Sequence, residues 1–592
     1  MKRLRTAILS LLMVVAMLLV SCGENKPTTD TEAPSTQQEA QTTDTSAPET
    51  DREFIKISNN SNLLIKLADS DYRSYVNDFK SAFELKTGMT MKMVNSSVAA
   101  TDFEMIVGRV SGREESVSFY EDISYAECAA EIVNGKLVVA TFTENMLEEA
   151  LSAVNRAIVK ENGEWGIWSD FSYSKALADI PDDIPKFETK SGTMIQGVKS
   201  NDGFQVGYTG CKKAEYEAYC QKLEGAGYTL YASNTVKNNE YMTYVTEKTM
   251  AHLTWQGEIS TFRVFVSPKG YLPATEAPKY TAVKTPTVAQ IMLTGGWGMS
   301  FVIQLEDGSF VVIDGGVNNA ADKSTLMTYL KSNKPSEHSK PRVTWILTHP
   351  HSDHIELALS FLQAYSNQIQ LDMISFNFPD VNSLTWSTDY TTTSEKQWAK
   401  QKIEETWKLM ADKFPNTKIF IHHTGQKLLL AGAEIEFIFT QEDWWPNGCQ
   451  TFNDTMSTFM VTFKNGKKFF VTGDSDQGVC NLMAKNYGDY LKCDIFQAVH
   501  HGQKGGTAAL YNLLKPTYVF WPNSKKKCTT TVGDIYEAPI HHSDRSSFNP
   551  ILFNDPNILG HFHGEQTTII NINTMTAIDG KGNTAVSFWP LR

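Results

Sequence analysis

Four side chains that can bind a metal ion lie within six residues of one another in the second half of the chain. Three histidines and an aspartate follow residues 343–347, an apolar run that predicts a buried strand, in the order Thr348-His349-Pro350-His351-Ser352-Asp353-His354. Because side chains alternate along an extended backbone, His349 and His351 point the same way and can share a cation. Asp353 and His354 come after the bend and can serve a second cation. Imidazole and carboxylate are ligands that suit zinc, manganese or iron.

Two further strand ends carry residues of the same kind. Residues 458–463 and 468–471 predict a hairpin that turns at Asn465-Gly466, and the motif Thr472-Gly473-Asp474 follows it. Residues 493–499 predict a strand that ends at His500-His501-Gly502. Ligands at the ends of separate strands allow a rigid sheet to present a metal site on loops. We therefore expect a metal site where these strand ends meet.

Other predicted elements lead into this part of the chain. Residues 288–293 predict a strand, and residues 300–305 and 310–313 predict a hairpin with an Asp307-Gly308 turn. The second strand of that hairpin ends at Asp314-Gly315-Gly316, and residues 323–331 predict a helix. This order places a hairpin and a helix before the buried strand that carries the first motif.

Together these motifs resemble the metallo-β-lactamase fold: His-x-His-x-Asp-His, then Thr-Gly-Asp, then His-His-Gly, after a hairpin that fits the start of that fold. They are most similar to the branch of the competence protein ComEC. That branch has Asn-Asp-Thr-x-Ser before the strand pair and His-His-Gly-Ser-Lys later; this chain has Asn453-Asp454-Thr455-Met456-Ser457 and His500-His501-Gly502-Gln503-Lys504. The resemblance covers residues 283–592. It implies an α/β fold, a four-layer αβ/βα sandwich with a dinuclear metal site on one edge.

The resemblance also implies roles for single residues. Carried over by position, His349 and His351 would be the ligands of the first metal. Asp353, His354 and His501 would be the ligands of the second metal, and Asp474 would bridge the two. Asp353 is also the residue best placed to orient the nucleophile or to accept its proton. His500 would contact the substrate or also reach the metal, and Lys504 would bind a phosphate oxygen as a point charge.

The chain departs from the family pattern at the third histidine of the first metal. The corresponding segment reads Phe439-Thr440-Gln441-Glu442, without a histidine. His422 and His423 are possible substitutes for this ligand, but the sequence fits an exposed pair of histidines equally well. Binding of one metal ion and binding of two are therefore both compatible with the sequence. His561 and His563, on a strand predicted over residues 559–570, are further candidates to line the site. His541 and His542 fit an exposed loop.

The predicted chemistry is hydrolysis. A bound divalent metal lowers the pKa of its water from about 15.7 toward 7, which supplies hydroxide at neutral pH. The ComEC-like motifs favour a phosphodiesterase that acts on a small or cell-wall-linked substrate. The alternatives are a hydrolase of an amide or lactone, as in β-lactamases, and a non-catalytic lipid-anchored protein that binds glycan through its N-terminal domains.

Length and composition limit the partners. The 592 residues predict three or four folding units at roughly 100–200 residues per domain. With 54 Lys+Arg and 67 Asp+Glu the net charge is −13, which argues against long nucleic acid as the main partner. It does not exclude phosphodiester chemistry at a cationic metal centre. Of the 13 histidines, only His252 precedes residue 330, so metal or acid–base chemistry is expected in the second half.

The first 22 residues predict an export signal with a lipid anchor. Lys2, Arg3 and Arg5 precede an apolar run over residues 7–20, which is too short to span a bilayer. Leu19-Val20-Ser21-Cys22 resembles a bacterial lipobox, in which the cysteine is lipidated. Residues 23–52 have the composition of a disordered tether. We therefore expect a protein held at the outer face of the cytoplasmic membrane or at the cell surface.

Two small α+β domains are predicted between the tether and the motifs, over residues 53–165 and 166–280, before a catalytic domain at 283–592. The first contains Met105–Ser116, which resembles the accessory domain before some glycoside hydrolase barrels; a generic α+β domain is the alternative. Strands are predicted at 103–107, 130–133, 136–141, 241–246, 250–256 and 261–267, with helices at 144–159 and 213–226. Seven cysteines follow Cys22, with no CxxC pair, and we expect mostly buried thiols.

Overall fold

The computed structural model describes residues 52–65, 72–110, 112–123, 127–141, 144–176, 184–200, 203–381, 393–525, 527–528 and 547–589. The predicted signal peptide, Cys22, the tether up to residue 51, and His541 with His542 lie outside the described residues. Within the described ranges, no helix is long and apolar enough to span a membrane. All seven cysteines after Cys22 are free thiols and buried, as the composition predicted.

Residues 54–176 form two sheets with three helices. The larger sheet has six strands in the spatial order β3 (Met91–Val94), β2 (Ser61–Ile65), β4 (Glu104–Val107), β6 (Lys136–Thr141), β5 (Glu127–Val133) and β9 (Ser172–Ala176). The smaller sheet contains β1 (Phe54–Lys56), β8 (Glu164–Trp168) and β7 (Val159–Glu161). The helices are α2 (Tyr72–Thr87), α3 (Glu114–Asp122) and α4 (Glu144–Ala157). The β5–β6 hairpin turns at Asn134-Gly135, as predicted, because both residues adopt positive φ angles there.

A second six-stranded sheet, antiparallel throughout, follows. Its spatial order is β10 (Thr193–Ser200), β11 (Gly203–Thr209), β15 (Thr261–Pro268), β14 (Thr249–Gln256), β13 (Asn239–Val245) and β12 (Thr229–Val236). The helix α5 (Lys213–Gly225) buries Tyr216, Tyr219 and Leu223 in the apolar cluster that also holds Phe262 and Val264 of β15. The predicted helix and three predicted strands of this region are confirmed within two residues.

The remaining chain forms two larger sheets. The eight-stranded sheet has the order β21 (Lys418–Ile421), β20 (Gln370–Phe376), β19 (Arg342–Ile346), β18 (Phe310–Asp314), β17 (Ser300–Gln304), β16 (Thr287–Gln290), β29 (Thr568–Asn571) and β30 (Thr576–Asp579). The seven-stranded sheet has the order β22 (Lys427–Leu430), β23 (Ala433–Phe439), β24 (Thr458–Phe463), β25 (Lys468–Val471), β26 (Ile495–Gln497), β27 (Tyr518–Trp521) and β28 (Gly560–His563). The helices that accompany them are α6 (Ala320–Asn333), α7 (Ser352–Tyr365), α8 (Thr393–Lys413), α9 (Gln441–Trp444), α10 (Gln477–Tyr487), α11 (Ala508–Leu514) and α13 (Asn549–Phe553).

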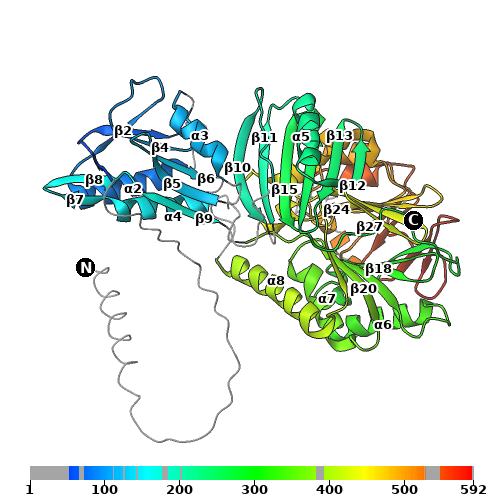
Figure 1. Ribbon diagram of the computed structural model, residues 1–592. Helices are drawn as coiled ribbons and strands as arrows, with labels where there is room; N and C mark the ends of the chain where they lie inside the picture. Colours follow the sequence, from blue (N-terminus) through cyan, green and yellow to red (C-terminus); the bar gives the residue numbers. More distant parts are fainter. Residues whose placement is uncertain are drawn as a thin grey trace, which may run out of the picture. The chain divides into compact units, whose positions relative to one another are not determined.

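Three apolar clusters show how these sheets and helices stack. The central cluster joins the facing sides of both sheets, with Phe301 and Ile313 from one and Phe459 and Phe520 from the other. A second cluster joins the other face of the eight-stranded sheet to α6, α7 and α8, which Figure 1 shows gathered beside β18 and β20. A third joins the seven-stranded sheet to α10, α11 and α13. The order helix, sheet, sheet, helix is the predicted four-layer αβ/βα sandwich, and it follows two smaller α+β units.

The strand predicted over residues 559–570 is wrong as a single element. β28 pairs in parallel with β27 in one sheet, and β29 pairs with β16 in the other. The chain crosses between the sheets at Gly564, where a Cβ atom would lie 2.6 Å from the carbonyl oxygen of Gly296. The apolar run is therefore continuous in the sequence but divided between two layers.

Candidate metal centre

The three motifs lie at the ends of strands from both sheets of the sandwich. The first follows β19 and leads into α7, so that His351 precedes the helix and Asp353 and His354 occupy its first turn. Thr472-Gly473-Asp474 follows β25, and His500-His501 follows β26, which pairs in parallel with β25. The sandwich thus brings distant residues together, such as His354 and His501, which are 147 positions apart in the chain.

Four of the predicted ligands form one compact group: Asp353, His354, Asp474 and His501. One ligand atom of each lies within 4.8 Å of the others, and all four residues are buried. The Nε2 atom of His501 lies 3.1 Å from a carboxylate oxygen of Asp353 and 3.1 Å from one of Asp474. The Nε2 atom of His354 lies 3.2 Å from the other oxygen of Asp474. Two imidazoles and two carboxylates therefore converge on a single point.

His349 and His351 lie beside this group. The Nε2 atom of His349 is 2.9 Å from Nδ1 of His351, and the ring centroid of His349 is 4.2 Å from that of His354. His500 reaches the group from the other chain segment, with its Nε2 atom 3.6 Å from Asp474. Its Nδ1 atom has no hydrogen-bond partner within the part of the chain that the structure describes. Asp474 is thus central to both sets of imidazoles.

In four of these imidazole rings, the nitrogen that faces away from the centre lies 2.7–3.1 Å from an oxygen atom. The pairs are His349 with the Thr348 hydroxyl, His351 with Glu395, His354 with Asp314, and His501 with the carbonyl of Pro522. Carboxylate and carbonyl oxygens accept, so the nitrogens that face them carry a hydrogen. The Thr348 hydroxyl donates to Asp314 and must therefore accept from His349. In each ring the nitrogen that faces the centre is left to act as a ligand, which is how metal-binding histidines are oriented.

The electrostatics of the group require positive charge at its centre. Burial disfavours the charged imidazole of His501, but the carboxylates of Asp474 and Asp353 outweigh it and raise the pKa of His501 to about 9. Burial likewise opposes ionisation of Asp353, but His354 and His501 lower its pKa to about 2. A divalent cation supplies the same positive charge and displaces those protons. With Nε2 of His354 unprotonated as a ligand nitrogen, the buried Oδ1 atom of Asp474, 3.2 Å away, has no hydrogen-bond donor among the described residues. This donor set fits a divalent metal ion.

Backbone strain is concentrated at the same place. Asp314, His500 and His501 have φ angles of 53°, 50° and 57°, in the left-handed region that residues other than glycine rarely adopt. Such residues cost on the order of 1–3 kcal/mol each and are retained where the surrounding structure requires them. The two consecutive histidines turn sharply after β26, so that His501 is directed into the buried group.

Sequence reasoning missed Asp314 as a site residue. It is fully buried and accepts hydrogen bonds from the backbone N–H of Thr348 (2.8 Å) and the hydroxyl of Thr348 (2.7 Å), besides that from His354. The signal was present in the sequence as an aspartate directly after a strand and before two glycines. Its contacts orient both the first motif and His354.

His422 and His423 are not the exposed pair that one interpretation predicted. Both are buried, because β23 and the second six-stranded sheet cover them. His422 stacks on Phe437 with ring centroids 3.7 Å apart, and its two nitrogens lie 2.8 Å and 2.7 Å from the hydroxyls of Ser375 and Ser457. His423 pairs with Glu442 at 3.0 Å. Neither nitrogen of His422 is left to bind a metal, so it does not substitute for the missing ligand.

His561 and His563 pack against aromatic side chains. His561 accepts a hydrogen bond from the indole of Trp521 at 3.1 Å and packs against Phe553 and Phe588, and burial lowers its pKa to about 3. His563 also lies against Phe588. Neither belongs to the compact group of ligands.

Cationic and aromatic side chains flank the centre. The ring of Trp297 stacks on that of His501 with centroids 5.6 Å apart, and the ammonium group of Lys527 lies 3.7 Å from the centroid of Trp297. Lys504 is exposed and acts electrostatically on Asp476, whose pKa burial and the carboxylates of Asp454 and Asp474 raise to about 7. Lysines on two different chain segments therefore lie near a buried acidic centre.

Comparison with known proteins finds similarity to solved structures alone: no protein-family model and no curated protein matches. The diiron β-hydroxylase CmlA from Streptomyces venezuelae matches at 10% identity with a TM-score of 0.25, over 44% of this chain and 47% of that one. A metallo-β-lactamase from Cronobacter sakazakii matches at 12% identity and a TM-score of 0.22, over 34% and 70%. A flavo di-iron protein mutant from Thermotoga maritima matches at 10% identity with a TM-score of 0.17, over 45% of this chain and 50% of that one. The chain thus spans about half the length of the first and third.

Proposed function

We propose that this chain is a metal-dependent hydrolase of the metallo-β-lactamase superfamily, in a ComEC-like branch, and that it acts as a phosphodiesterase. One observation carries the proposal: the Asp474 carboxylate contacts imidazoles of two chain segments, His354 at 3.2 Å on one, and His501 at 3.1 Å and His500 at 3.6 Å on the other. That arrangement supports a bridging carboxylate between two ligand sets, with His349 and His351 on one side and Asp353, His354 and His501 on the other. One or two divalent ions, zinc in the first instance, are the implied cofactors.

A divalent ion held by these residues would lower the pKa of its bound water and polarise the scissile oxygen. The residues of the chain supply the rest. Asp353, one carboxylate oxygen of which lies 3.1 Å from Nε2 of His501, orients the nucleophile and accepts its proton. His500, whose side chain is 19% exposed and whose Nδ1 atom has no hydrogen-bond partner among the described residues, contacts the substrate.

Charge around the centre favours an anionic substrate. Lys504 and Lys527 are exposed side chains on the two chain segments that flank the metal centre, and each can bind a phosphate oxygen as a point charge. A phosphodiester carries one negative charge at the scissile group, which a cationic centre flanked by lysines binds in its ionised form. The net charge of −13 makes a small or wall-linked phosphodiester a better substrate than long nucleic acid.

The place of action is also proposed. The basic first residues, the apolar run and Cys22 support export and lipid anchorage at the outer face of the cytoplasmic membrane, where a wall-linked substrate is accessible. Labelling of the expressed protein with a radioactive fatty acid tests this proposal. We expect label in the wild type and none in Cys22→Ala; equal labelling of both contradicts the anchor.

Hydrolysis of three chromogenic substrates tests the activity: bis(p-nitrophenyl) phosphate, p-nitrophenyl phosphorylcholine and nitrocefin. We expect turnover of a phosphodiester in the presence of zinc or manganese, a loss of at least about 10²-fold in His354→Ala, and an unchanged rate in His338→Ala, which alters a histidine outside the site. Turnover of nitrocefin alone would instead support a hydrolase of amide bonds. No turnover of any substrate by the metal-loaded wild type contradicts the enzymatic proposal.

A further inference from the structure

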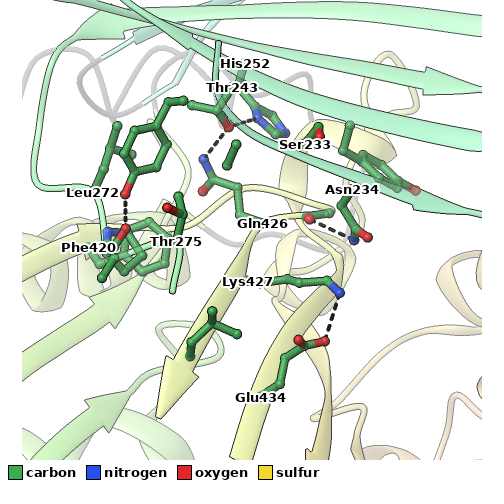
Figure 2. A pocket seen from close by; sticks show the side chains of 17 residues that line it. Ser233, Asn234, Thr243, His252, Leu272, Thr275, Phe420, Gln426, Lys427 and Glu434 are labelled. Carbon is green, nitrogen blue, oxygen red and sulfur yellow. Dashed lines mark hydrogen bonds and ion pairs between the residues drawn. The ribbon is translucent and has the colours of Figure 1, made fainter. Parts of the chain in front are cut away.

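A cavity of about 280 Å³ lies away from the metal ligands, between the second six-stranded sheet and the sandwich (Figure 2). Strands β12, β13 and β14 provide one wall, and the segment around Gln426 and Lys427 provides the other. Leu272, Pro273 and Thr275 close a third side. None of the candidate metal ligands lines it, so it is a separate site.

The floor of the cavity is polar and its hydrogen-bond directions are fixed. His252, Thr243 and Gln426 line it and are each at least nine-tenths buried. The Nε2 atom of His252 lies 2.9 Å from the carbonyl oxygen of Thr424, so it must donate. Because burial lowers the pKa of His252 to about 3, the ring is neutral and its Nδ1 atom accepts from the Thr243 hydroxyl at 2.9 Å. Thr243 then accepts from the amide of Gln426 at 3.1 Å.

These directions leave defined groups for a ligand. The amide oxygen of Gln426 accepts from the backbone N–H of His423, and its nitrogen uses one hydrogen on Thr243, which leaves a second N–H. Both amide hydrogens of Asn234 go to the carbonyl of Gly425 and to Glu436, so its oxygen has no partner among the described residues. The wall therefore offers an acceptor and the floor offers a donor.

The rim is exposed and hydroxyl-bearing. Ser233 and Thr275 are exposed, and neither hydroxyl makes a hydrogen bond within the described parts of the chain. The ring of Tyr231 and the side chain of Leu272, both partly exposed, add apolar surface. A buried polar floor below an exposed rim is the arrangement of a ligand pocket with a solvent opening.

The cavity carries no net charge. Its only cation, among the lining residues, is Lys427, which pairs with the carboxylate of Glu434 at 2.9 Å, as the dashed line in Figure 2 shows. His252 is neutral. An ionic ligand would have to break the ion pair or enter without a counter-charge, and both cost free energy. The lining thus favours a neutral ligand that both donates and accepts hydrogen bonds.

The walls are held in place by a contact that only glycine permits. Gly425 has a φ of 84°, and a Cβ atom there would lie 1.9 Å from the ring of Tyr241. Its carbonyl accepts the hydrogen bond from Asn234 at 3.0 Å, which joins β12 to the sandwich. The cavity is therefore preformed, and little ordering is required when a ligand enters.

We propose that this cavity binds one neutral sugar unit, such as the terminal residue of a glycan. A sugar offers hydroxyl groups that donate and accept, and a C–H face that can pack on the ring of Tyr231. The volume lies just below the range of about 300–1,000 Å³ that is usual for small-molecule pockets, which limits the ligand to a single ring. Bound this way, a glycan would be held on the same chain as the metal centre.

The test uses the full chain and three probes, glucose, galactose and N-acetylglucosamine, with binding measured by saturation-transfer NMR and calorimetry. We expect at least one to bind with a dissociation constant near about 1 mM. Ser233→Trp fills the rim and should weaken binding at least tenfold. Thr229→Trp places the same bulk at another exposed position of β12, outside the cavity, and should leave binding unchanged.

His354→Ala should bind the same sugar with unchanged affinity, because the cavity shares no residue with the metal centre. Absence of binding by all three probes overturns the proposal, as does equal binding by the wild type and Ser233→Trp. Loss of binding in His354→Ala would place the sugar at the metal centre instead. Since sugar binding is measured without catalysis, a failure of the hydrolase proposal leaves this test intact.

Discussion

The Nδ1 atom of His354 lies 2.7 Å from a carboxylate oxygen of Asp314, and both side chains are fully buried. Asp314 ends β18, and His354 lies in the first turn of α7, 40 residues later. The same carboxylate accepts from the backbone and hydroxyl of Thr348. Asp314 therefore sets the direction of a ligand ring without facing the ligand group itself, and it is a positioning residue.

Replacement of Asp314 by asparagine should weaken metal binding. The amide can accept only through its single oxygen, so at least one of the three donors around it loses its partner. Partners of this kind typically change metal affinity by about 10–100-fold. Competition with a chromogenic zinc chelator measures the affinity. Asp372→Asn, which alters a carboxylate that pairs with Arg342 outside the site, is the matched control and should bind as the wild type does. Equal affinity of both variants would contradict the positioning role.

His422→Asn should retain metal and lose stability. Both ring nitrogens are hydrogen-bonded to serine hydroxyls and the ring stacks on Phe437, so the side chain supports packing between β21 and β23. We expect a loss of about 2–4 kcal/mol in the free energy of unfolding, from chemical denaturation, because a buried ring and two hydrogen bonds are removed. Metal content per chain should stay at the wild-type value. A fall in metal content of the folded variant would show that His422 is a ligand after all.

Lys527→Ala should raise KM for a phosphodiester and leave kcat nearly unchanged. The ammonium group is held over Trp297, which stacks on His501, so it can contact an anionic substrate at the rim. An interaction made equally in the bound substrate and the transition state changes KM alone. We expect a rise of about 3–10-fold at low salt that shrinks as ionic strength increases. Lys485→Ala, an exposed lysine on α10, is the control. A fall in kcat with constant KM would assign Lys527 to the chemical step instead.

Acidification should destabilise the contact between the second six-stranded sheet and the sandwich. Burial, with a contribution from the nearby His423, lowers the pKa of His252 from its ordinary value of 6.5 to about 3, while Glu442 acts in the opposite direction. The folded state therefore holds fewer protons than the unfolded state between these two pH values, so stability falls as the pH drops below 6.5.

The His252→Asn variant isolates this dependence. It should be less stable than the wild type at pH 7.5, but its free energy of unfolding should fall by about 1–2 kcal/mol less between pH 7 and pH 5. Urea denaturation of metal-loaded protein at both pH values provides the comparison. Parallel pH profiles of variant and wild type would mean that His252 takes up its proton without unfolding.

The ligand motifs were predictable because each follows a strand with a clear apolar pattern, so local sequence is enough to place them at a sheet edge. The role of Asp314 was not predictable, since its partners Thr348 and His354 are distant in the chain. A single aspartate after a strand also lacks the spacing to other ligand residues that marks a metal-binding motif. His422 and His423 looked exposed because β21 ends just before them. The covering residues, among them His252 and Phe265, belong to another part of the chain that the local pattern does not reveal. The prediction of a single strand over residues 559–570 was wrong for a similar reason. The two halves of this apolar run pair with strands of different sheets, which the local sequence does not reveal.

The central claim is that Asp474 joins two sets of histidine ligands around divalent metal. Elemental analysis by mass spectrometry of the zinc-loaded and then dialysed full chain tests it most directly, with Asp474→Ala compared with the wild type and with Asp372→Ala as a surface control. The account predicts at least one tightly held ion per wild-type and control chain and a loss of at least about tenfold in affinity in Asp474→Ala, because both ligand sets lose a shared carboxylate. A wild-type chain that retains no metal, or an Asp474→Ala variant that retains as much as the wild type, would contradict it.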